Sequence, residues 1–155
     1  MKIIRFLTTT ALCGILAVCA KAHDKNAPLN SEQKQFLSDY EAVRAALADD
    51  NLRNAQQAAA VIADRAGATA ETDPHAQAKR DAANRLAKAE NLSTARDAFK
   101  VLSKQAAHLV DNQKGYYLAH CPMVPNEEGD WVQTTKKISN PYMGKAMATC
   151  GSIEK

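Results

Sequence analysis

Residues 92–109 read LSTARDAFKVLSKQAAHL. Apolar side chains recur there every three or four residues, at Leu92, Ala95, Phe99, Leu102, Ala106 and Leu109. An α-helix turns once in about 3.6 residues, so this spacing places the apolar side chains on one stripe. The stretch therefore predicts an amphipathic helix that ends before Gly115.

Three similar stretches precede this one, and the first begins after Asn30 or Ser31 as its N-cap. Its apolar positions are Phe36, Tyr40, Val43 and Leu47. The second runs over residues 52–66, with Gly67 as a left-handed C-cap. The third, which is the least apolar, opens at residues 73–74, where an aspartate N-cap precedes a proline at the first helical position.

Residues 31–114 are therefore predicted to form four helices joined by short links, and the natural packing of such helices is an antiparallel four-helix bundle. Residues 115–155, named the tail here, are predicted to be an ordered loop followed by a short helix. The predicted fold class is all-α. We expect residues 23–155 to form a single helical domain.

The first 22 residues have the pattern of an export signal. A positively charged start precedes an apolar stretch at residues 6–20, and small residues flank a cleavage site ending at Ala22. The apolar stretch is shorter than the 18 or more residues of a spanning helix. We expect cleavage near Ala22, a soluble periplasmic or secreted protein, and no stable membrane insertion. A lipoprotein signal at Cys19 is disfavoured because Val18 is bulky and branched.

Residues 23–155 carry no net charge, since they contain 17 basic and 17 acidic residues. A nucleic-acid-binding protein needs a basic surface, so this class is disfavoured. A purely electrostatic attachment to membranes is disfavoured for the same reason. With 46% hydrophobic residues in 155, the chain has enough apolar side chains for one folded domain.

The tail has a different composition from the helical part. It holds four of the six glycines, three of the five prolines, the only tryptophan and three of the four methionines. Signal cleavage leaves Cys121 and Cys150 as the only thiols, and both lie in the tail. Two cysteines in an oxidising compartment often form one disulfide, so a Cys121–Cys150 bridge is one interpretation.

A soft-metal site is the other interpretation of the same residues. With Asn140 as N-cap and Gly151 as the stop, a helix of about ten residues puts Met143, Met147 and Cys150 on one face. Cu(I) and Ag(I) prefer thiolate and thioether ligands. The candidate ligands are Cys121, Met123, Met147 and Cys150, with His120 or Met143 as a further member.

The tail also resembles a known family. It reads YLAHCPM at residues 117–123, WVQ at residues 131–133 and ISNPYMGKAMATCG at residues 138–151. This order of CPM, a tryptophan and NPYxGxxMxxCG resembles a bacterial exported domain family of unknown function. That family occurs alone and fused to CusB-type heavy-metal efflux adaptors. The helical part is similar to the family only in pattern.

The resemblance implies a copper role for Cys121, Met123, Met147 and Cys150, and an efflux adaptor as a partner. The function predicted is an exported Cu(I) or Ag(I) binding protein, either a periplasmic carrier or an accessory to heavy-metal efflux. The alternative is a helical interaction module without a metal, in which a Cys121–Cys150 disulfide pins the tail to the helices.

No enzyme is predicted. The chain lacks a phosphate-binding glycine loop, paired zinc cysteines, HExxH and GxSxG. A nucleophilic Cys121 with its neighbour His120 as base is disfavoured, because adjacent residues rarely reach hydrogen-bond geometry with each other. His23 is expected to be a mobile terminal residue. His75 and His108 are expected to be solvent-facing or bundle-edge histidines on helices, since neither has a histidine partner three or four residues away.

Overall fold

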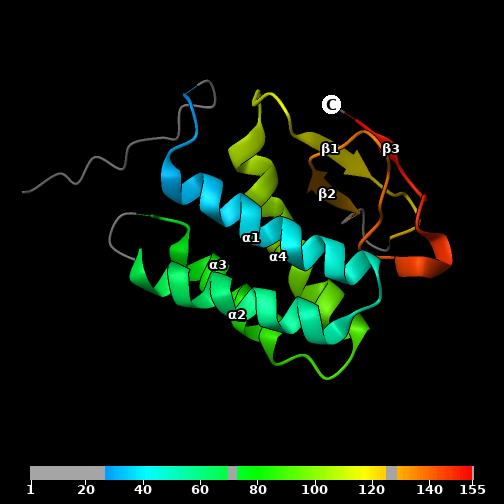
Figure 1. Cartoon of the computed structure of the whole chain (residues 1–155), viewed down its shortest axis with the longest axis horizontal. Helices are drawn as coiled ribbons and strands as arrows, with labels where there is room; N and C mark the ends of the chain where they lie inside the picture. Colours follow the sequence, from blue (N-terminus) through cyan, green and yellow to red (C-terminus); the bar gives the residue numbers. More distant parts are fainter. Residues whose placement is uncertain (1–26, 70–72, 125–128, 155) are drawn as a thin grey trace, which may run out of the picture.

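The structure is a computed structural model that describes residues 27–69, 73–124 and 129–154 (Figure 1). The predicted signal peptide, residues 1–22, and His23 lie outside these ranges. None of the helices within the described ranges combines the length and the apolar character that a membrane span requires.

Four α-helices precede the tail, as the sequence predicts. They are α1 (Ser31–Ala48), α2 (Leu52–Ala68), α3 (Ala76–Ala87) and α4 (Leu92–Val110). Asparagine side chains cap three of them, with Asn30, Asn51 and Asn91 accepting the backbone N–H groups of Gln33, Asn54 and Thr94.

Two predicted helix ends are wrong. α3 begins at Ala76, because the Asp73 carboxylate accepts the N–H of His75 at 2.8 Å and holds Pro74 and His75 in a turn before the helix. Gly67 is not a left-handed C-cap but lies inside α2, which continues to Ala68.

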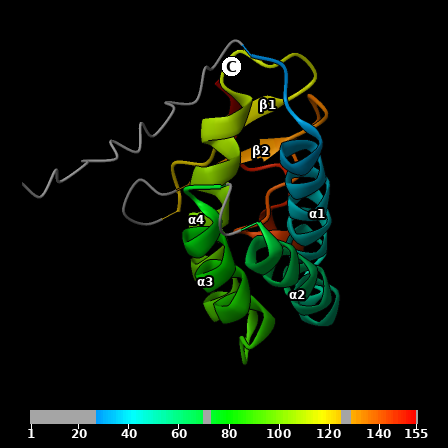
Figure 2. The same cartoon turned by 90° about the vertical axis from the view of Figure 1, so that its left-hand side faces the viewer.

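The helices pack in chain order, with α1 on α2, α2 on α3 and α3 on α4, and α1 also contacts α4. Figure 2 shows α1 beside α2 and α3 beside α4. Alanines, including Ala55, Ala59, Ala82 and Ala83, are buried in this core. Their small side chains let the helix backbones approach closely.

The tail contains a three-stranded antiparallel sheet, so the prediction of an all-α fold is wrong there. β1 (Tyr117–His120) lies between β2 (Asp130–Gln133) and β3 (Ser152–Ile153). Tyr117 pairs with Gln133 at one end of the β1–β2 ladder and His120 with Asp130 at the other. Strands of two to four residues are too short to show a clear alternation in sequence, and their pairing partners lie far along the chain.

The α-helix predicted from Pro141 to Cys150 is also wrong. A turn is followed by a short 3-10 helix, η2 (Gly144–Met147). Gly144 has a φ of +58°, which an α-helix does not allow. Met143, Met147 and Cys150 therefore do not form one stripe of a regular helix.

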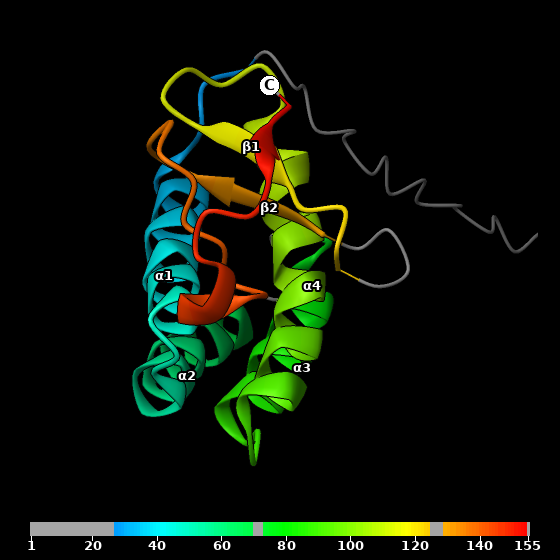
Figure 3. The same ribbon diagram turned by 90° about the vertical axis from the view of Figure 1, so that its right-hand side faces the viewer.

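The tail packs on the helices through β2, which contacts α4, and η2, which contacts α1. Figure 3 shows the tail lying across the side of the molecule where α1 and α4 lie. Trp131 in β2 is completely buried, as expected for an anchor. Its ring centroid lies 6.1 Å from that of Tyr142, which in turn lies 5.8 Å from that of Phe99.

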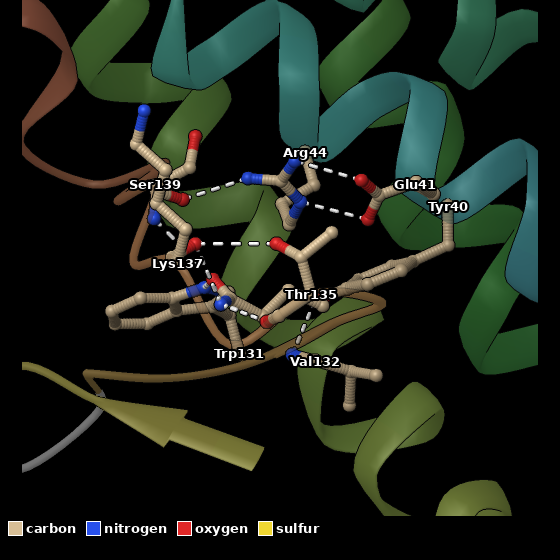
Figure 4. A network of polar contacts seen from close by, with 9 residues as sticks. Tyr40, Glu41, Arg44, Trp131, Val132, Thr135, Lys137 and Ser139 are labelled. Carbon is tan, nitrogen blue, oxygen red and sulfur yellow. Dashed lines mark hydrogen bonds and ion pairs between the residues drawn. The ribbon is translucent and has the colours of Figure 1, made fainter. Parts of the chain in front are cut away.

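Polar side chains of α1 hold the tail backbone (Figure 4). The Tyr40 hydroxyl accepts the Val132 N–H at 3.1 Å, and burial raises the pKa of Tyr40 far above its usual range. Arg44 donates to the Ser139 carbonyl at 2.7 Å while Glu41 pairs with the same guanidinium. The helices therefore fix the backbone of β2 and of the segment after it.

Asp50, in the turn between α1 and α2, binds the tail at η2. Its carboxylate accepts the Lys145 N–H at 3.0 Å and pairs with Arg96 at 2.5 Å. Both contacts lower the pKa of Asp50 below its usual range, and the hydrogen bond from the Lys145 N–H has the larger effect. Arg96 also donates to the Pro141 carbonyl at 2.8 Å, so it links α4 to the turn before η2.

Gly144→Ala is expected to destabilise the protein more than Gly115→Ala. Both glycines have positive φ, so each alanine meets a backbone cost of roughly 1–2 kcal/mol. A Cβ on Gly144 would also collide with Asp50 and Arg96, whereas a Cβ on Gly115 meets nothing within 4 Å. Urea unfolding of the two variants measures the difference. Equal losses of stability would show that the Asp50–Arg96 contact does not restrict η2.

Candidate soft-metal site

Cys121 and Cys150 meet in the folded chain. Their Sγ atoms lie 2.7 Å apart although 29 positions separate them in the sequence, and both thiols are free. The expectation that these two cysteines lie close in space is confirmed.

The β1–β3 pairing explains why the two thiols meet. Ala119 pairs with Ile153 and His120 with Ser152, so continuing this antiparallel register brings Cys121 beside residues 150–151. The Cys121 N–H donates to Gly129, and the Asn140 side chain donates to the Cys150 carbonyl at 2.8 Å. Backbone contacts therefore position both cysteines.

The two thiols differ in exposure. Cys121 is completely buried, whereas Cys150 is partly exposed. The contact with the Cys121 thiol, together with desolvation, raises the pKa of Cys150. The contact between the two sulfurs therefore favours the protonated form of the Cys150 thiol.

The two methionines next to these cysteines are exposed. Met123 is 58% exposed and Met147 is 37% exposed. In the described part of the chain, Val61 is the one other large hydrophobic residue with an exposed side chain. Met123 follows Cys121 by two residues, and the Cys150 N–H donates to the Met147 carbonyl at 3.0 Å. Neither thioether is used to fill the core.

The two further candidate ligands have other contacts. Met143 is partly buried and packs against the hydrophobic core. His120 Nδ1 lies 2.7 Å from the Asp130 carboxylate, its partner across the β1–β2 ladder. The described residues contain no group of three or more His, Cys, Asp and Glu side chains placed to hold a metal ion, so His120 does not complete such a group with the two thiols.

The remaining residues of the tail pattern have structural roles. Asn140 is buried, and its amide oxygen accepts the N–H groups of Tyr142 and Met143. The Tyr142 hydroxyl donates to the Asp130 carbonyl at 2.6 Å, and its oxygen lies 3.1 Å from the Ser103 hydroxyl. Trp131 and Tyr142 pack against each other. Among the sulfur-bearing members of the pattern, Met123 and Met147 are the two with exposed side chains.

The helical part of the chain matches a family model described as a protein of unknown function (DUF3347), over residues 36–116. The match covers just over half of the chain. The chain belongs to the DUF3347 family. The matched region of this DUF3347 chain begins inside α1 and ends before β1, so it contains most of α1, the other three helices and none of the cysteines and methionines of the tail. No curated protein and no solved structure matches the chain.

Sequence reasoning missed one pair of residues in the DUF3347 chain. The rings of His75 and His108 lie 5.5 Å apart, edge to face, although no contact between them was predicted. His75 precedes α3 and His108 lies in the last turn of α4. α3 and α4 are consecutive helices that pack together, so the start of α3 lies beside the end of α4. The antiparallel packing expected from the sequence could therefore have predicted that His75 and His108 lie close together.

A cavity of about 740 Å³ lies where α4 leads into β1, and it is lined by residues 107–108 and 110–118. Neither cysteine and none of the tail methionines lines it. The sulfur atoms of this DUF3347 chain are therefore not arranged around that cavity.

Proposed function

We propose that this chain is an exported carrier of a soft monovalent metal ion, Cu(I) or Ag(I). Cys121 and Cys150 supply the thiolates, and Met123 and Met147 supply the thioethers. The observation that carries the proposal is the contact between the two thiols, with the exposed thioethers of Met123 and Met147 two and three residues away from them along the chain. Single exposed apolar side chains such as Val61 are common at protein surfaces, so exposure alone does not support a metal site. The support comes from the chemistry, because the exposed side chains of Met123 and Met147 are thioethers that lie within three residues of a cysteine.

The donor set fits a soft ion better than a hard one. Thiolates and thioethers select Cu(I), whereas carboxylates and carbonyls suit Mg²⁺, Ca²⁺ and Mn²⁺. Within the described residues no His, Cys, Asp and Glu group large enough for a harder ion is present. In this proposal the four helices, as an antiparallel bundle, are the rigid support on which the anchors Tyr40, Arg44 and Arg96 hold the tail.

Metal binding requires a small movement of the thiols. A thiolate sulfur lies about 2.3 Å from a bound metal ion, so two thiolates on one ion lie up to about 4.6 Å apart. The Sγ atoms are 2.7 Å apart, and loading would separate them by up to about 2 Å. Cys150 is the side chain suited to move, because it is partly exposed and lies between η2 and β3, whereas Cys121 is buried.

The resemblance of the tail to exported domains fused to CusB-type adaptors supports a heavy-metal efflux adaptor as the acceptor of the ion. It also supports export, with cleavage near Ala22. Transfer between the two proteins would proceed by exchange of sulfur ligands, and the surface position of Met123 and Met147 leaves both thioethers accessible to an acceptor.

The first test is an anaerobic Cu(I) titration of the reduced protein against a competing chromogenic chelator. The reduced protein is expected to take up one ion. M123L/M147L is expected to bind it about tenfold more weakly, which corresponds to ~1.4 kcal/mol. M143L is the matched control, because Met143 packs in the core, and its affinity is expected to equal that of the wild type. No competition by the reduced wild type, or equal affinity in M123L/M147L, would contradict the proposal.

The second candidate is an exported interaction module pinned by a Cys121–Cys150 disulfide. The contact between the two sulfurs favours it. A thiol count on protein purified anaerobically after export separates the two candidates. Two free thiols support the carrier, whereas their complete absence together with failure to bind Cu(I) after reduction supports the pinned module.

A further inference from the structure

The thiol pair is asymmetric. Cys121 is completely buried, Cys150 is partly exposed, and the two sulfurs are in contact at 2.7 Å. An external reagent therefore meets Cys150 first, while Cys121 can reach only Cys150. This arrangement resembles the division between an attacking and a resolving thiol in general thiol chemistry.

We infer that Cys150 is a site of thiol–disulfide exchange with small organic disulfides, and that Cys121 resolves the product. The inference goes beyond the proposed metal carriage and does not depend on it.

The reaction has two balanced steps. The Cys150 thiolate attacks one sulfur of the external disulfide, forms a mixed disulfide and releases one thiol. The Cys121 thiolate then attacks Cys150 Sγ, which forms the internal disulfide and releases the second thiol. Each cysteine loses one proton, the pair is oxidised by two electrons, and the external disulfide is reduced to two thiols.

Hydrogen bonds hold the backbone of both cysteines, so the difference in side-chain exposure is what keeps the two roles from exchanging. The Cys121 N–H donates to the Gly129 carbonyl, and the Val124 N–H donates to the Cys121 carbonyl, so both sides of Cys121 are fixed. Cys150 follows η2 and precedes β3, and its N–H bonds to the Met147 carbonyl. An external disulfide must align its two sulfurs with the attacking thiolate, and only Cys150 has open space beside it.

One consequence rests on the proposed function. The internal disulfide leaves no thiolate for a metal ion, so oxidised protein is expected not to bind Cu(I), and bound Cu(I) is expected to block the exchange. Oxidation would then control when the carrier is loaded.

The test uses glutathione disulfide and three forms of the exported protein, namely wild type, C121S and C150S. Each carries C13S and C19S, so that an uncleaved chain adds no other thiol. Intact-mass spectrometry follows the products without any metal. C121S is expected to keep one glutathione adduct on Cys150, and C150S is expected to react at least about tenfold more slowly because Cys121 is buried. The wild type is expected to lose two hydrogens and keep no adduct.

Urea-unfolded C150S is the control for the chemistry. It is expected to react as fast as unfolded C121S, which shows that burial and not the residue itself protects Cys121. Equal rates for the folded C121S and C150S proteins, or a wild type that accumulates the mixed disulfide, would overturn the inference. Because no metal is present, this result is separate from the success or failure of the Cu(I) titration.

Discussion

Trp131→Ala is expected to lower the free energy of unfolding by about 3–5 kcal/mol, the range for removing a buried large aromatic side chain. Trp131 is completely buried and packs against Tyr142. Its Nε1–H donates to Gln133 at 2.9 Å, so the substitution also removes a partner from a buried amide. Urea unfolding followed by circular dichroism measures the loss.

Two further variants test whether the loss of stability comes from the missing indole ring of Trp131. Trp131→Phe keeps most of the ring and loses the hydrogen bond, so its loss of stability is expected to be smaller than that of Trp131→Ala. Val61→Ala changes a side chain that is 41% exposed and is expected to stay within about 0.5 kcal/mol of the wild type. A Trp131→Ala protein as stable as Val61→Ala would contradict the role of β2 as the contact that fixes the tail.

Replacing both cysteines is expected to have the largest effect on metal binding. C121S/C150S is expected to bind Cu(I) at least about 100-fold more weakly than the wild type, which corresponds to ~2.8 kcal/mol. Each thiolate brings a negative charge that a thioether lacks, so this loss should exceed that of M123L/M147L. The same anaerobic competition titration compares the three proteins.

A loss of binding must be separated from a loss of folding. A serine at position 121 places a hydroxyl in a completely buried site, so C121A/C150A serves as a second variant without that hydroxyl. Both pairs are expected to retain the helical circular dichroism spectrum, because Tyr40, Arg44 and Arg96 still hold the tail. If either double variant folds and binds Cu(I) as tightly as the wild type, the thiols are not ligands.

The four helices were predictable from the sequence because their apolar stripes depend on local spacing. The stripe of α4 is buried at Ala95, Phe99, Leu102, Ala106 and Leu109, as its sequence predicts. The sheet was not predictable in the same way. β3 has two residues, and its pairing with β1 depends on a contact that spans more than 30 residues. No local sequence pattern predicts a strand of two residues.

The proximity of the two cysteines was predicted because the disulfide and the metal site both need the two thiols together, whereas the local structure around Cys150 was predicted wrongly. The sequence argument placed Cys150 on an α-helix with Met143 and Met147, whereas the structure has a 3-10 helix that ends at Met147. The positive φ of Gly144 is the physical cause, and it accompanies a close approach to Asp50 that no local pattern contains. The exposure of Met123 and Met147 also became visible only in the fold, since methionines at helical spacing usually fill cores.

The most direct test of the central claim is X-ray absorption at the copper K-edge on reduced protein loaded anaerobically with one equivalent of Cu(I). The account predicts an edge typical of Cu(I) and a first shell of sulfur alone, at about 2.3 Å as for other metal–thiolate bonds. The C121S/C150S protein is expected to lose the ion on desalting. A first shell of nitrogen or oxygen in the wild type, or an unchanged sulfur shell in C121S/C150S, would contradict a site built on Cys121 and Cys150.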